Sequence, residues 1–118
     1  MTKFFVWILA VFVSFVSISV YADDYTAGKA RQYAQNAQYY QKKADGYRKE
    51  AQYFQKKAEG YQREASYYTR KGDSDRAKDY LRKAERAMDD YKTQMRYAAN
   101  ADEKASYYLR KASDILRP

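Results

Sequence analysis

The chain has 118 residues, contains neither cysteine nor histidine, and carries a formal net charge of +8 at pH 7. This composition excludes disulfide bonds, triads that depend on Cys or His, and the usual zinc sites. No glycine-rich phosphate loop is present. We therefore expect no catalytic residues, no metal ligands and no cofactor, and we predict that the protein is not an enzyme.

Residues 1–22 differ in composition from the rest of the chain. Lys3 is the only charged residue among them, and residues 4–21 carry no charge. Val-Tyr-Ala at residues 20–22 places small or β-branched side chains at the two positions that a signal peptidase recognises. This order is typical of a signal peptide. We predict that residues 1–22 are cleaved and that the protein is exported to the periplasm or outside the cell. The alternative is a retained anchor, since about 18 apolar residues are the lower limit for a membrane span.

Residues 23–118 contain few large aliphatic side chains. They include three Leu, one Ile, one Phe and two Met, but 16 Ala and 14 Tyr, and without Lys3 the net charge is +7. Such a composition normally indicates disorder. The regular spacing of Ala and Tyr indicates structure instead.

The sequence repeats every 14 residues, as AQYYQKKADGYRKE at 37–50 and AQYFQKKAEGYQRE at 51–64, and a third copy begins at residue 65. Fourteen residues are two heptads, so alanine and aromatic residues each recur every seven residues. This pattern predicts a left-handed coiled coil with an interaction seam. The expected seam residues are Ala37, Ala44, Ala51, Ala58, Tyr33, Tyr40, Tyr47, Phe54, Tyr61 and Tyr68. Gly46 and Gly60 interrupt the repeat 14 residues apart, which suggests either a packing role or simple duplication.

The alanine spacing breaks after Ala65 and resumes at Ala77. Gly-Asp-Ser-Asp at residues 72–75 can end one helix and cap the next. We predict an all-α, antiparallel two-helix coiled-coil hairpin over residues 23–118, with one arm at about 24–71, a turn at 72–75 and a second arm at about 75–116. A break near Asn100 is an open alternative. The larger side chains expected to face the first arm are Leu81, Met88, Met95, Leu109, Ile115 and Leu116.

Basic residues recur on the first arm outside the predicted seam. They are candidates for contact with an anionic envelope surface, formed by lipid head groups, lipopolysaccharide or acidic polymers. The alternative is a solubilising face with ordinary pairs four residues apart, such as Asp45 with Lys49. For an exported protein we do not expect a nucleic-acid partner. The candidate residues are Lys42, Lys43, Lys56, Lys57, Arg70 and Lys71.

Two functions fit these features. The first is a structural or interaction protein that forms homo-oligomers through its Tyr and Ala faces, because two helices alone bury little surface. The second is a basic holdase-type chaperone or binding module for anionic polymers, membrane surfaces or unfolded clients. In shape and charge alone such a hairpin is similar to the coiled-coil arms of Skp-type periplasmic chaperones, whose β-structured body has no counterpart in the sequence. Membrane contact is expected only at the surface unless the leader is retained. The identity of the partner and the number of subunits are left open.

Overall fold

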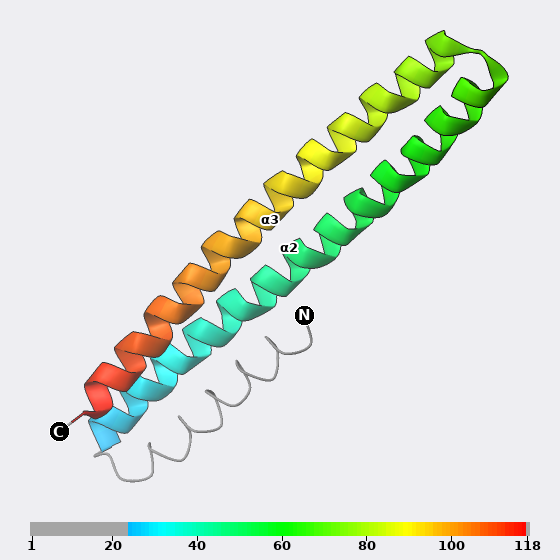
Figure 1. Ribbon diagram of the computed structural model, residues 1–118. Coiled ribbons are helices and arrows are strands. Elements are labelled where there is room, and N and C mark those ends of the chain that lie inside the picture. Colours follow the sequence, from blue (N-terminus) through cyan, green and yellow to red (C-terminus); the bar gives the residue numbers. More distant parts are fainter. Residues whose placement is uncertain (1–23, 118) are drawn as a thin grey trace. The chain divides into compact units, whose positions relative to one another are not determined.

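The computed structural model describes residues 24–117. It contains helix α2, Asp24–Lys71, and helix α3, Ser74–Leu116 (Figure 1). The prediction of an all-helical chain with two long helices is confirmed over this part. Helix α3 continues without interruption through Asn100. The predicted leader, residues 1–22, lies outside the described residues.

The residue types explain why both elements are helical. Ala, Gln, Glu, Lys and Arg, which have high helix propensity, fill most positions of α2 and about half of those of α3, and Thr26 and Thr69 are the only β-branched residues of α2. Asp24 in the first turn and Arg70 and Lys71 in the last turn of α2 have the charges that a helix dipole favours at each end. Neither helix in the described range has an apolar stretch long enough to cross a membrane.

The described chain packs as two units, each built from a segment of α2 and a segment of α3. The terminal unit contains residues 24–42 and 102–117, and the turn unit contains residues 43–101. In the turn unit the two helical segments lie side by side and run antiparallel from the turn (Figure 1). In the terminal unit, Ala30, Ala34 and Ala112 form a buried cluster. The side chains of Tyr33, Ile115 and Leu116 pack against that cluster.

The turn at residues 72–73 is closed by hydrogen bonds at both helix ends. Gly72 has a φ of 82°, and the backbone N–H groups of Asp73 and Gly72 donate to the carbonyls of Tyr68 and Thr69 at 2.9 and 3.1 Å. This is the Schellman ending, which favours glycine in the left-handed conformation. The Asp73 carboxylate then accepts a hydrogen bond from the backbone N–H of Arg76 at 3.1 Å and caps α3.

Alanine supplies all of the buried hydrophobic residues in the described range. Ala37, Ala44, Ala51 and Ala58 are 0 to 1 % exposed, and each lies seven residues from the next. Their small side chains allow two backbones to approach closely, so larger rings are placed at the flanks of the contact. The seam tyrosines Tyr33, Tyr40, Tyr47, Tyr61 and Tyr68, together with Phe54, are half-buried.

One sequence expectation about packing is wrong, and one open alternative is narrowed to a preference. Leu81 is 49 % exposed and does not face α2, because it follows Tyr80, and the contact with α2 is occupied by Tyr80 and the alanines of α3. Of the two alternatives for Gly46 and Gly60, the contacts within one chain favour duplication, since a Cβ added at Gly46 would meet no atom within 4 Å and one at Gly60 would meet only the end of Arg63 at 4.0 Å.

Candidate interaction surface

Tyrosine rings join the two helices of the turn unit. The rings of Tyr68 and Tyr80 are stacked nearly parallel, with centroids 5.6 Å apart and an interplanar angle of 5°. Tyr61 also contacts Tyr80, at 6.2 Å and 35°, and Tyr47 contacts Tyr97 at 5.4 Å and 56°. Offset stacking of this kind adds to the area that the rings bury. Three of the predicted seam tyrosines are therefore occupied by contacts within one chain.

The terminal unit repeats this arrangement around Tyr108. Its ring stacks on Tyr40 at 5.7 Å and 6°, and on Tyr33 at 6.3 Å and 29°. Tyr80 and Tyr108 were not among the predicted seam residues. Their position indicates that role, because each follows an alanine of the α3 seam, Ala77 or Ala105, by three residues.

A second set of tyrosines is exposed and is paired with lysines. Tyr53 is 53 % exposed, and the Lys57 Nζ lies 5.2 Å from its ring centroid. Tyr67 is 42 % exposed, and the Lys71 Nζ lies 4.9 Å from its ring. In each pair the lysine is four residues further along the helix, which places it beside the ring. The same sequence pattern recurs at residues 107–111, where the Lys111 Nζ lies 5.5 Å from the Tyr107 ring.

Lys57 has a resolved change in ionisation. Its hydrogen bond to Tyr53, followed by the charges of Tyr53 and Tyr61, raises the pKa of Lys57 above its usual value of 10.5, and Asp90 adds to the effect. Lys57 is therefore fully positive at neutral pH. The pair of Tyr53 and Lys57 presents an aromatic ring and a fixed positive charge to solvent.

A line of cations follows the outer face of α2 in the turn unit. These residues, Lys49, Lys56, Arg63 and Arg70, are all exposed and are spaced seven residues apart. At 1.5 Å per residue this spacing is about 10.5 Å. We call these four residues the basic line. The predicted candidates Lys56 and Arg70 belong to it, whereas Lys57 and Lys71 lie beside the exposed tyrosines. Lys42 is exposed and has the same heptad position, seven residues before Lys49, but belongs to the terminal unit; Lys43 is exposed in the turn unit outside the line.

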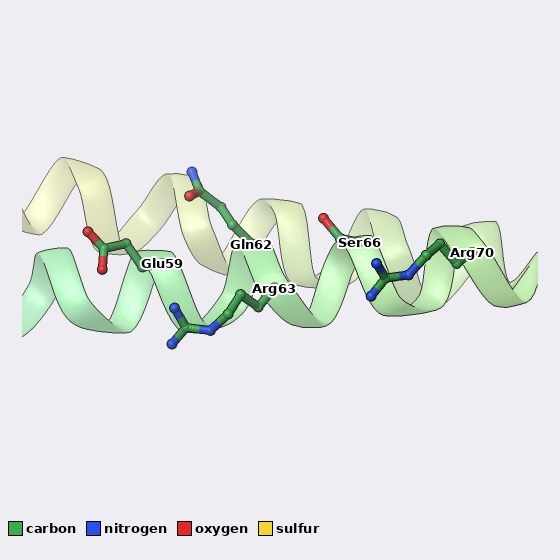
Figure 2. A pocket seen from close by; sticks show the side chains of 5 residues that line it. All are labelled: Glu59, Gln62, Arg63, Ser66 and Arg70. Carbon is green, nitrogen blue, oxygen red and sulfur yellow. The ribbon is translucent and has the colours of Figure 1, made fainter.

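Part of the basic line borders a shallow groove. Figure 2 shows the five lining side chains, all of which project from α2: Glu59, Gln62, Arg63, Ser66 and Arg70. The groove has a volume of about 440 Å³ and is lined by a single helix. Small-molecule sites enclose most of their ligand, so this groove is better suited to a ligand that lies along the helix.

The positive charge is concentrated on α2. Helix α2 has 11 basic and five acidic residues, whereas α3 has 10 basic and eight acidic residues. Asp45 pairs with Arg48 at 2.9 Å and Asp79 pairs with Arg82 at 3.2 Å. In each pair the arginine lies three residues after the aspartate, whereas the sequence suggested that Asp45 pairs with Lys49, four residues away. The planar guanidinium, with five N–H donors, is well suited to bind a carboxylate. Within residues 24–117 no group of three or more His, Cys, Asp or Glu side chains could hold a metal ion.

Comparisons with protein-family models, with curated proteins and with solved structures find no match to this chain. The chemistry of the exposed residues is therefore the basis for assigning a function.

Proposed function

We propose that this protein is an exported, non-enzymatic binding protein whose α2 face binds a linear anionic polysaccharide of the cell envelope. The observation that carries the proposal is the basic line, in which four exposed cations stand about 10.5 Å apart along one helix. When these cations neutralise charges on a polyanion, the counterions of the polyanion are released, which favours binding.

The spacing of the basic line favours a sparsely charged polymer. Nucleic acid carries a phosphate about every 3.4 Å along each strand, so the basic line would meet only about one phosphate in three. An acidic polysaccharide such as polygalacturonate carries one carboxylate per sugar ring, so its charges are less dense than the phosphates of duplex DNA. The exposed rings of Tyr53 and Tyr67 also offer flat apolar surfaces on which sugar rings can pack.

The experiment compares two variants with the same change in net charge. In the first, Lys49, Lys56, Arg63 and Arg70 are replaced by Gln. In the second, four exposed cations of α3 are replaced by Gln: Lys78, Arg86, Lys92 and Arg96. We expect the first variant to lose at least 10-fold in affinity for polygalacturonate, at about 1.4 kcal/mol per factor of ten, and the second to lose much less. Equal losses, or equal binding to neutral dextran, would overturn the proposal.

Two other partners are tested in the same titration. Anionic lipid vesicles and an unfolded outer-membrane protein test the membrane-surface and holdase alternatives. Binding to either that depends on the basic line and exceeds binding to polygalacturonate would replace the polysaccharide as the proposed partner. Circular dichroism of both variants checks that the helices are retained.

Self-association is a second candidate function, favoured by exposed aromatic residues. In one chain the seam alanines are already buried, whereas Tyr53, Tyr67 and Tyr97 are 42 to 53 % exposed. We propose that the paired helices form a left-handed coiled coil and that further copies associate through these exposed rings, because exposed apolar groups favour such contacts. Sedimentation of the purified chain at micromolar concentration should show an oligomer. A monomer would contradict this candidate.

Export rests on the predicted signal peptide at residues 1–22. We propose cleavage after Ala22, as the composition of the leader indicates. The intact mass of the chain recovered from producing cells should begin at Asp23. A mass that includes residues 1–22 would support the anchored alternative.

A further inference from the structure

We propose that the two parallel tyrosine pairs, Tyr68 with Tyr80 and Tyr40 with Tyr108, are sites of oxidative cross-linking that form dityrosine within one chain. The oxidant is hydrogen peroxide acting through a haem peroxidase. Each cross-link would join α2 covalently to α3, one in the turn unit and one in the terminal unit. This inference concerns the seam tyrosines and is independent of the basic line.

Geometry distinguishes these pairs from the other aromatic contacts between the helices. Their interplanar angles are 5° and 6°, with centroids 5.6 and 5.7 Å apart. Parallel rings at this separation are offset, so the edge of one ring lies over the other. Dityrosine forms through a bond between two ring carbons ortho to the hydroxyl, and a parallel, offset pair can bring two such carbons together without a change in ring tilt. Tyr47 and Tyr97 are as close, at 5.4 Å, but their rings are tilted by 56°.

The four tyrosines are partly accessible to solvent, since each is half-buried and none is fully buried. Residues 23–118 contain no Cys, no Trp and only two Met, so few other residue types compete with tyrosine for oxidation. Oxidation is therefore directed to tyrosine.

The reaction balances in two steps. The peroxidase removes one electron and one proton from each phenol, and the two electrons and two protons reduce hydrogen peroxide to two water molecules. The two phenoxyl radicals then form one carbon–carbon bond, and the hydrogen on each bonded carbon moves to the phenol oxygen. The product is lighter than the two tyrosines by two hydrogen atoms.

Such a cross-link performs the role of a disulfide bond in a chain without cysteine. It closes the loop between the joined residues and so reduces the conformational freedom of the unfolded chain. The Tyr40 to Tyr108 bond closes a much longer loop than the Tyr68 to Tyr80 bond, so it should stabilise the chain more.

The test treats the dilute purified chain with hydrogen peroxide and a haem peroxidase and then digests it with trypsin. The sequence predicts two cross-linked products, residues 64–70 joined to 79–82 and residues 32–42 joined to 105–110. Fragmentation should assign the bonds to Tyr68 with Tyr80 and to Tyr40 with Tyr108. The yield of each should not change on fivefold dilution, because the bond forms within one chain.

Conservative variants provide the controls. Tyr68→Phe should abolish the first product and retain the second, and Tyr40→Phe should do the reverse, while circular dichroism confirms that each variant is folded. Oxidation should raise the melting temperature of Tyr68→Phe more than that of Tyr40→Phe. The proposal is overturned if no dityrosine forms, if its yield falls in proportion to dilution, or if Tyr47 bonds to Tyr97 as efficiently as the parallel pairs react.

Discussion

Replacing Gly46 and Gly60 by alanine should stabilise the protein. Both residues lie inside α2, where glycine costs about 1 kcal/mol relative to alanine. The added methyl groups meet no atom closer than 4.0 Å, so no steric cost opposes the gain. The two sites are 14 residues apart, about 21 Å along the helix, and their effects should add. The double variant should gain about 2 kcal/mol.

Thermal and urea unfolding followed by circular dichroism measure this gain. For a chain of this size about 1 kcal/mol corresponds to a shift of roughly 4–8 °C, so the double variant should melt roughly 8–16 °C higher. Gly72→Ala is the control, because Gly72 has a φ of 82° and alanine there should destabilise by about 1 kcal/mol. If Gly46→Ala or Gly60→Ala lowered the stability, the glycines would have a packing role and the described surroundings of α2 would be wrong.

Three further predictions follow from the described contacts. Ala58→Leu should destabilise the protein by about 1–3 kcal/mol because Ala58 is 1 % exposed. Gln62→Leu, at an exposed position, should change the stability by less than about 0.5 kcal/mol. Equal urea midpoints for the two variants would show that Ala58 is not in the seam. Asp73→Ala should cost about 1 kcal/mol through loss of the α3 cap, and Asp73→Asn should retain most of that stability in the same assay. Contact with Tyr53 raises the pKa of Lys57, so the stabilising effect of this contact is complete below the pKa of Lys57 in the unfolded chain. It is lost at alkaline pH, as the pH rises through the folded pKa above 10.5. An NMR titration should show a lower pKa for Lys57 in Tyr53→Phe, and an unchanged value would contradict the contact.

The helices and their ends could be predicted from the sequence because local rules determine them. Alanine and long polar side chains favour helix throughout, and Gly72 followed by Asp73 is a specific signal for an ending and a cap. The spacing of the alanines also indicated which positions are buried, as Ala44 and Ala51 illustrate. These features depend on residues that are close together in the chain.

Features that depend on pairing between helices were harder to predict. Leu81 was expected in the contact, but apolar character alone does not determine the facing side, and Tyr80 together with the alanines fills the space. The stacking of Tyr68 on Tyr80 requires the register of one helix against the other, which a 14-residue repeat in α2 does not specify. The basic line follows from the heptad register alone, whereas no motif in the chain identifies a partner.

The salt dependence of polygalacturonate binding tests the central proposal most directly. If the basic line neutralises the polymer, a plot of the logarithm of affinity against the logarithm of salt concentration should be steep for the unmodified chain. Replacing the four cations of the basic line by Gln should reduce that slope by about 3, taking a single-stranded polyanion as a guide, and replacing four cations of α3 should leave it nearly unchanged. The same slope for both variants would show that net charge alone attracts the polymer and would contradict a binding face on α2.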